Sequence, residues 1–311
     1  MPKPYVAINQ TKVSNQAESF KLINDVGPKV CMVTANSDSF VGFQNHIQVG
    51  IFPMGGKYGA AQLDMTQTLN PIGLSQYTFW KHWQDHDQMH YDQFDSIFRL
   101  CAGCSDMVVE GPFEPIYEIV DHDIPDNMTM TEMAAKLGDA FKNGKDMTSV
   151  SQPYGMRIIA AGKHRIIPGQ EQAFEQAAHD TMQLFKQTVP GFLGYMILKQ
   201  IGASAIGSLQ LNPEGLHQAL ETRGEYPPRN KEGNFATLDA KSTPTEYVVH
   251  MEWQDLNTAQ LGLARVVVNS KIRKVHDGVL ASLIEGPYIT FWNPLMEDTT
   301  WRLFLHDEYE G

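Results

Sequence analysis

Two histidines four residues apart, His86 and His90, are the side chains in this sequence best placed to do chemistry. Residues four apart lie on the same face of a helix, so both imidazoles can reach one metal ion. The same face carries Trp83, Phe94 and Ile97, which predicts that the pair faces the core. Two buried imidazoles need polar partners, and either a metal ion or nearby backbone carbonyl groups can supply them.

A carboxylate downstream of this pair would complete a metal site. Glu114 and the two histidines together offer two neutral nitrogens and one carboxylate, and they leave coordination positions open. This is the ligand set of mononuclear non-haem iron(II). Glu110 and Glu118 are alternative carboxylates, and Glu118 shares strand parity with Glu114. Spacing alone does not choose among these three residues.

A zinc-dependent hydrolase is the alternative to an iron enzyme. Zinc peptidases use the motif H-E-x-x-H, in which the glutamate acts as the base, and some add a second glutamate downstream. Here Asp87 stands in the position of the base, between His86 and His90. The shorter side chain of aspartate would reach the attacking water poorly, which disfavours this chemistry.

The three cysteines are Cys31, Cys101 and Cys104. Cys31 lies in the β-branched segment 30–34, which predicts a strand, and a cysteine there is more typical of a core than of a nucleophile. Cys101 and Cys104 form a C-x-x-C at the end of a helix predicted over 80–103. No second pair completes a zinc ribbon, and the helix dipole has the wrong sense to activate a thiol. The two fit either the lining of the metal cavity or a buried apolar position.

The chain repeats itself. Residues 83–85 recur as 253–255, residues 110–113 as 285–288, and residues 40–43 as 192–195. Each half follows the order β-α-β-β-α-β, which predicts an α+β protein of two ferredoxin-like units. The predicted boundaries are 1–122 for the first unit, 123–155 for a connector with a short helix over 130–141, and 156–311 for the second unit. Two such units packed sheet to sheet form a dimeric-type α+β barrel within one chain.

The repeat also separates the two units chemically. With segments 83–85 and 253–255 aligned, and 110–113 and 285–288 aligned, the three candidate ligands have apolar or neutral counterparts, namely Leu256, Gln260 and Ile289. The first unit is therefore predicted to carry the metal site, and the second unit to lack metal ligands.

Composition excludes several classes of protein. The chain has 311 residues, of which 42% are hydrophobic, so disorder is excluded and the chain is long enough to bury a large core. A formal net charge of −12 argues against nucleic acid as a partner. No apolar run approaches the ~20 residues of a membrane span, and the N-terminus shows no secretory signal. Together with the odd number of cysteines, this predicts a cytoplasmic protein.

Several segments resemble the sulfur oxygenase reductases, and together they extend over nearly the whole chain. They are 27–35 (GPKVCMVTA), 40–48 (FVGFQNHIQ), 76–81 (QYTFWK), 98–101 (FRLC), 111–119 (GPFEPIYEI), 151–155 (SQPYG), 190–194 (PGFLG), 286–289 (GPYI) and 293–297 (NPLME). The resemblance implies an enzyme that converts elemental sulfur or polysulfide, with dioxygen and water, to sulfite, thiosulfate and hydrogen sulfide. Such an enzyme needs no external electron donor.

The resemblance also assigns roles to individual residues. It implies that a mononuclear non-haem iron is the cofactor and that an essential cysteine holds the sulfur chain as a persulfide. Two further cysteines play auxiliary roles. The implied iron ligands are His86, His90 and Glu114, the essential cysteine is Cys31, and the auxiliary cysteines are Cys101 and Cys104.

The resemblance further implies a homo-oligomer, a hollow shell of 24 subunits that handles sulfur inside. Met130 and Phe141 resemble pore-lining positions of that shell. Leu295 and Met296 fall where the family has a pair of methionines near the entrance of the pocket, with leucine in place of the first methionine.

Overall fold

Strands that are buried on both faces form the centre of the computed structural model, which describes residues 3–16, 18–19, 25–52, 71–125, 157–204, 206–215, 217, 244–298 and 300–305. In β1 (Tyr5–Val13), Val6 and Ile8 are buried on one face and Ala7 on the other, so both faces of this sheet are covered. The predicted helix over 130–141, with Met130 and Phe141, lies outside the described residues.

The two halves contain the same elements in the same order. The first half contains β1, α2 (Gly27–Thr34), β2 (Phe40–Phe52), β3 (Ile72–Trp80), α3 (Trp83–Asp92), α4 (Phe94–Ala102), the 3-10 turn η3 (Ser105–Met107), β4 (Val108–Phe113) and β5 (Pro115–Asp123). The second half contains β6 (Ile158–Ile166), α7 (Glu171–Thr188), β7 (Phe192–Ala203), β8 (Glu246–Trp253), α9 (Leu256–Val268), α10 (Ser270–Ala281) and β9 (Leu283–Asp298), followed by α11 (Thr300–Leu305). This order confirms the predicted pair of ferredoxin-like units.

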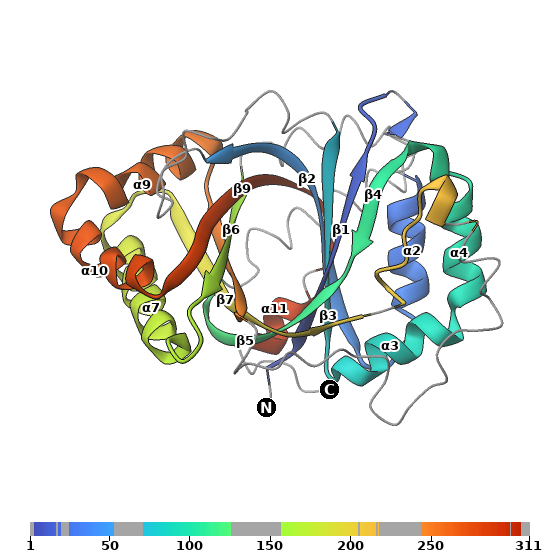
Figure 1. The fold of residues 1–311 in the computed structure, drawn as a ribbon, viewed down its shortest axis with the longest axis horizontal. Helices are drawn as coiled ribbons and strands as arrows, with labels where there is room; N and C mark the ends of the chain where they lie inside the picture. The colour runs from blue at the N-terminus through green and yellow to red at the C-terminus, as the bar shows by residue number, and fades with distance from the viewer. Residues whose placement is uncertain are drawn as a thin grey trace.

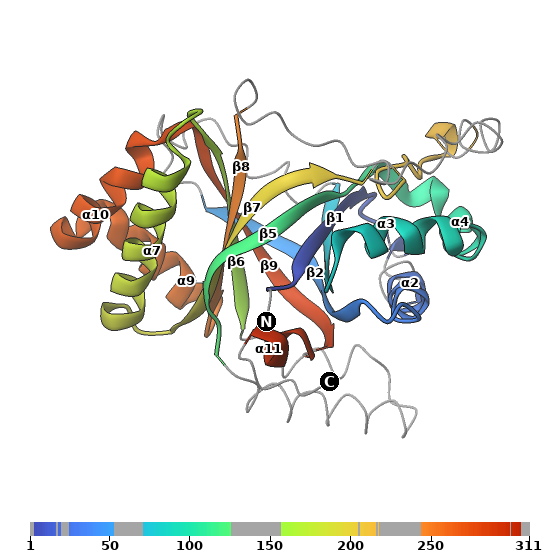
Figure 2. The same cartoon turned by 90° about the horizontal axis from the view of Figure 1, so that it is seen from below.

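The strands close into a barrel. Eight of them follow the order β3-β2-β9-β6-β8-β7-β5-β1, and β1 pairs again with β3, while β4 lies beside the end of β1. Each unit extends its last strand to the other unit: β9 pairs with β6 and with β2, and β5 pairs with β1 and with β7 (Figure 2). The prediction of an α+β barrel within one chain is therefore confirmed.

Apolar side chains lie inside the barrel together with buried polar ones such as His46 and His250, and apolar side chains also cover it on two sides. An eight-stranded barrel has an interior just wide enough for side chains, and here the interior cluster includes Tyr77, Tyr117 and Trp292. Helices α2, α3 and α4 lie on one side of the barrel, and helices α7, α9 and α10 lie on the other (Figure 1). The cluster beneath the second set of helices includes Phe185 and Trp253. Each unit thus has a space between its half of the sheet and its helices.

The structure corrects the prediction for Cys31, which lies in helix α2 and not in a strand. Short β-branched runs do not distinguish a strand from a buried helix. The sequence signal that decides is Pro28, because proline in the first turn of a helix loses no hydrogen bond and has the right φ. Within this helix Cys31 is buried, whereas Met32 is exposed.

The helix predicted over 80–103 is two helices, α3 and α4, which are interrupted at Gln93. No glycine or proline marks this break, and its backbone angles are φ −109° and ψ 12°. Tertiary packing accounts for the break, because α3 contacts β1 and β3 whereas α4 contacts α2. The break also separates Cys101, on α4, from the helix axis that carries His86 and His90.

Buried histidines make the stability of this fold sensitive to acid. Burial lowers the pKa of His164 to about 3 and that of His276 to about 4. In the unfolded chain these histidines bind a proton near pH 6.5, whereas in the folded chain they stay neutral to a lower pH. The free energy of unfolding present at pH 7 therefore decreases as the pH falls below 6.5. At pH 5 each of these histidines costs about 2 kcal/mol.

We expect His276→Leu to weaken this dependence on pH. The difference in unfolding free energy between pH 7.5 and pH 5, measured by urea denaturation, should shrink by about 2 kcal/mol. The exposed His82 provides the control, since His82→Gln should leave the difference unchanged. An unchanged difference in His276→Leu would show that other groups control acid stability.

Candidate metal centre

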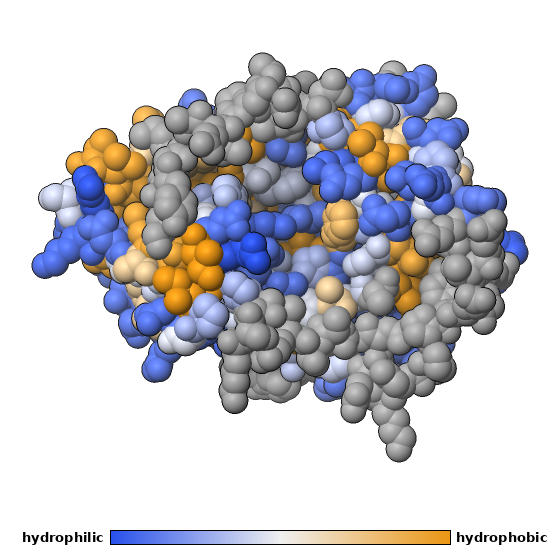
Figure 3. Space-filling model, viewed as in Figure 1, coloured by the Kyte–Doolittle hydropathy of each residue, from blue (hydrophilic) through white to orange (hydrophobic). Residues whose placement is uncertain are grey.

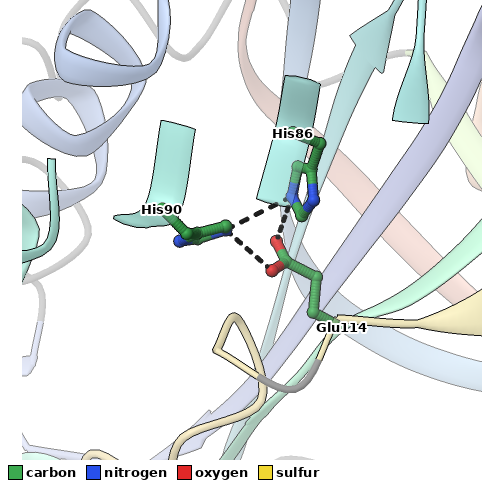
Figure 4. Close-up of side chains that lie close together, drawn as sticks. All are labelled: His86, His90 and Glu114. Atoms are coloured by element: carbon green, nitrogen blue, oxygen red, sulfur yellow. Dashed lines mark hydrogen bonds and ion pairs between the residues drawn. The ribbon is translucent and has the colours of Figure 1, made fainter. Parts of the chain in front are cut away.

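His86, His90 and Glu114 converge on one point (Figure 4). The Nε2 atoms of the two histidines are 3.3 Å apart. Glu114 Oε1 lies 3.3 Å from His86 Nε2, and Glu114 Oε2 lies 3.0 Å from His90 Nε2. The histidines come from consecutive turns of α3, and Glu114 occupies the short break between β4 and β5. The structure thus brings together the three residues predicted as metal ligands.

These distances fit a metal ion. Two atoms that each lie about 2.1 Å from one ion are about 3.0 Å apart when the bonds are perpendicular and about 3.4 Å apart in a tetrahedron. The three observed separations fall within this range. Two neutral nitrogens and a carboxylate that converge in this way leave other coordination positions open, as in the ligand set of non-haem iron.

Burial and charge are balanced within the cluster. His86 is 1% exposed and Glu114 is 4% exposed. Burial alone would lower the pKa of His86, but Glu114 and Asp87 outweigh it and raise the pKa to about 9. Burial alone would raise the pKa of Glu114, but the two imidazoles hold the pKa below its usual range. Glu114 therefore stays ionised, as a metal ligand must be.

Asp87 supports this centre from the other side of His86. It is buried, and its Oδ1 lies 3.4 Å from His86 Nδ1, whereas the centre lies at Nε2. The two atoms lack the geometry of a hydrogen bond, so the carboxylate acts on His86 through its charge, which helps to raise the pKa of the imidazole. This position does not suit the base of a zinc peptidase, which must reach the water beside the metal.

The alternative carboxylates lie elsewhere. Glu110 pairs with Lys12, and Glu118 lies 3.9 Å from Lys199. The side chains of Glu110 and Glu118 are 44% and 43% exposed, so both ion pairs are at the surface. The parity that Glu118 shares with Glu114 carries no weight, because Glu114 lies in neither strand.

A segment of the second unit holds Glu114 in place. The backbone N–H of Ser204 donates to the carbonyl of Glu114 at 2.9 Å, and the N–H of Glu114 donates to Ser208 Oγ at 3.0 Å. Gly207 lies directly against the carboxylate. Sequence reasoning missed this segment, although the run of small residues over 202–208 is a signal of close approach.

We expect Gly207→Ala to displace the carboxylate of Glu114 and weaken metal binding. A Cβ atom at this position would lie 1.4 Å from Glu114 Oε2, which is the end of a flexible side chain, so the fold can persist while the carboxylate moves. The metal affinity should fall about tenfold or more, as measured by competition with a chelator. Gly103→Ala is the matched control, since nothing lies within 4 Å of that added atom. Wild-type affinity in Gly207→Ala would contradict the role of this contact.

The second unit has no such centre at the equivalent position. Strand pairing shows that Trp80, and not Trp83, corresponds to Trp253. Trp80 pairs with the start of β1, and Trp253 pairs with the start of β6, which is the first strand of the second unit. The repeat alignment through 83–85 and 253–255 is therefore wrong by three residues. The residues that correspond to His86, His90 and Glu114 are Ala259, Leu263 and Ile289.

An apolar cavity of about 30 Å³ occupies the equivalent place in the second unit. Its lining includes Leu263 and Ile289, together with Val249 and the buried His164 and His276. Leu263 and Ile289, the counterparts of His90 and Glu114, thus line one cavity beneath α7, α9 and α10.

Cys31 lies in a separate set of contacts within the first unit. Its sulfur accepts hydrogen bonds from Gln76 Nε2 at 2.7 Å and from Asn45 Nδ2 at 3.4 Å. The residue is 1% exposed, and burial raises the pKa of the thiol to about 12 although both amides oppose it. Met296 pairs with Asn45 across β9 and β2, so the structure places it beside this site.

Cys101 and Cys104 lie at the end of α4 and just beyond it. Burial raises the pKa of Cys101 to about 12 and also raises that of Cys104. The thiol of Cys104 donates to the carbonyl of Leu100 at 3.6 Å. Because α4 packs against α2, these cysteines belong to the same helical layer as Cys31.

Two solved structures share this architecture. One is an anthrone oxidase-like protein, with 12% identity and a TM-score of 0.56, over 95% of this chain and 93% of that chain. The other is a protein of Fusobacterium nucleatum assigned as a monooxygenase, with 8% identity and a TM-score of 0.50, over 96% of this chain and 94% of that chain. At these identities the likeness shows a shared fold.

None of the helices within the described ranges combines the length and the apolar character of a membrane span.

The family model for sulphur oxygenase reductase matches residues 2–302, which include both units, the histidines of α3 and Glu114. This match confirms the resemblance of the sequence segments and identifies an oxidoreductase of sulfur metabolism. The chain therefore belongs to the sulphur oxygenase reductase family.

Proposed function

We propose that this enzyme catalyses the oxygen-dependent disproportionation of elemental sulfur or polysulfide to sulfite, thiosulfate and hydrogen sulfide. The proposed cofactor is a mononuclear non-haem iron held by His86, His90 and Glu114. The proposed nucleophile is Cys31, which holds the sulfur chain as a persulfide. The observation that carries the proposal is the buried triangle of two imidazoles and one carboxylate in a chain of this family.

Iron bound at this centre would supply the redox chemistry of oxygenation and disproportionation. The protein contributes the arrangement around it. Ser204 and Ser208 fix the backbone of Glu114, and the carboxylate of Asp87 places a negative charge 3.4 Å from Nδ1 of His86. Because the centre is buried, little water competes for the open positions.

Cys31 would capture the substrate by nucleophilic attack. The thiolate attacks one sulfur atom of a ring or chain, a new S–S bond forms, and the neighbouring S–S bond breaks with its electron pair on the departing sulfur. The thiol proton passes to water. Burial raises the pKa of this thiol to about 12 even with the two amide hydrogen bonds in place, so only a small fraction is ionised at pH 7.

The repeat supports a shared chamber for the cysteine and the iron. Strand pairing makes Val249 the counterpart of Gln76, which contacts Cys31. Val249 lines the cavity of the second unit together with Leu263 and Ile289, the counterparts of two iron ligands. By the same geometry, Gln76 and the iron ligands should face one space in the first unit. Cys101 and Cys104 are proposed to have auxiliary roles near this space.

A homo-oligomer, formed as a hollow shell of 24 subunits in the cytoplasm, is the proposed assembly. Apolar side chains are exposed around α9 and the start of β9 (Figure 3). Leu261 and Val268 are 69% and 77% exposed, and Ile284 and Tyr288 are also exposed. Exposed apolar groups of this kind are typical of surfaces that are covered in an assembly.

The test uses purified protein, dispersed sulfur and no added reductant. We expect sulfite, thiosulfate and hydrogen sulfide to form in air and sulfite to be absent in argon, with about one iron atom per chain by elemental analysis. Bound zinc without oxygen consumption would instead favour the hydrolase alternative. An absence of products from iron-loaded protein would contradict the proposed function.

A further inference from the structure

Two amide side chains converge on the sulfur of Cys31. Asn45 on β2 and Gln76 on β3 stand directly opposite each other, so both project from the same face of the sheet. Their NH₂ groups donate to Cys31 Sγ at 3.4 Å and 2.7 Å. Asn45 Oδ1 also lies 3.7 Å from Sγ, where it can accept the proton of the thiol. The sulfur thus has partners in both of its protonation states.

The second unit shows what the fold requires at these positions. The residues that correspond to Asn45 and Gln76 are Ile197 and Val249, which pair in the same register. Ile197 and Val249 are buried in the apolar core beneath α7, α9 and α10. Amides at such positions cost free energy unless they are hydrogen-bonded, so packing alone does not account for a pair of them in the first unit.

We infer that Asn45 and Gln76 form an amide cradle that stabilises negative charge on the sulfur of Cys31 and makes it more nucleophilic than it would be if buried without them. Hydrogen bonds from neutral N–H donors are stronger to an anion than to a thiol, so they favour the charged form. In this site they oppose the effect of burial, which favours the thiol. The inference rests on the proposed role of Cys31 as the nucleophile. Asn45 and Gln76 are positioning residues, because they act through Cys31.

The cradle can be tested without sulfur or iron chemistry. Methyl methanethiosulfonate is a small neutral probe: the thiolate attacks its thiomethyl sulfur, a disulfide forms, and methanesulfinate leaves with the electron pair. The rate of modification of the Cys31 peptide is measured by mass spectrometry between pH 7 and pH 9 in the full-length holoenzyme. Because the reaction consumes thiolate, a rise of one pKa unit lowers the thiolate fraction about tenfold, and since the more basic thiolate is also more nucleophilic the rate falls about threefold at each of these pH values.

Gln76→Leu is expected to slow the modification about threefold, since it removes one donor at similar size. Gln76→Glu is expected to slow it further, since a carboxylate beside the sulfur repels the thiolate. A slower rate in Gln76→Glu than in Gln76→Leu would reflect the charge at this position, and a merely structural role of Gln76 would not produce that difference. Gln48→Leu, the same substitution elsewhere on β2, is the control and should react at the wild-type rate.

A second measurement removes any dependence on access of the probe. In a background of Cys101→Ser and Cys104→Ser, the rates are measured again with the larger probe N-ethylmaleimide, and Gln76→Leu should slow both probes by the same factor, because a change in the thiolate fraction does not depend on probe size. Wild-type rates with both probes in folded Gln76→Leu and Gln76→Glu would overturn the cradle. The proposed function fails separately, if Cys31→Ala still forms sulfite from sulfur.

Discussion

Cys31→Ala is expected to lower the oxygen-dependent production of sulfite from sulfur by roughly a hundredfold or more, while the metal stays bound. The reason for the loss is chemical, since alanine cannot form a bond to sulfur. The reason for metal retention is geometric. Cys31 belongs to α2 and contacts Asn45 and Gln76, whereas the candidate metal ligands come from α3 and from the segment between β4 and β5.

The measurement compares product formation with metal content on the same preparation. Cys31→Ser is the matched variant, because serine keeps a hydrogen-bonding group of similar size but is a much weaker nucleophile, and it should also be inactive. If metal content falls in proportion to activity in both variants, Cys31 would be a structural residue. If activity survives with full metal content, the persulfide would have to form elsewhere.

Glu114→Ala is expected to lose metal and activity together. The substitution removes the carboxylate ligand and leaves only the Nε2 atoms of His86 and His90, which are 3.3 Å apart. Two nitrogens hold a divalent ion much less tightly than two nitrogens and an anion, so the metal content after dialysis against a chelator should fall more than about tenfold. Activity on sulfur should fall to the same extent.

Two further carboxylates of the same region provide the controls. Glu110→Ala and Glu118→Ala remove exposed groups paired with Lys12 and Lys199, and both variants should keep metal and activity. Full metal retention in Glu114→Ala would contradict the assignment. Metal loss in Glu118→Ala alone would return the ligand role to the residue with the same strand parity.

Spacing predicts the two histidine ligands because the relevant geometry is local. His86 and His90 are one turn apart on one helix, and that relation holds whatever the rest of the chain does. The break at Gln93 lies after both of them, so it leaves their relation intact. Glu114 was chosen from three carboxylates only by the resemblance, since its position between two strands depends on tertiary structure.

The features that sequence reasoning missed depend on distant contacts. The five residues from Val30 are mostly β-branched and so predict a strand, whereas the signal for the helix of Cys31 is the proline in its first turn. The segment with Gly207 reaches Glu114 only because β7 and β5 are neighbours in the closed barrel. The correct match of Trp80 with Trp253 likewise needed strand pairing, since the Trp-Gln-Asp identity pointed three residues away.

The contact between Gly207 and Glu114 has a consequence for the history of this protein. A duplicated half that has no ligands at the matching positions would be free to diverge if the first half were self-sufficient. It is not, because the second half supplies the backbone against which the carboxylate rests. Selection on the chemistry of the first half therefore extends to the segment of the second half that contacts Glu114.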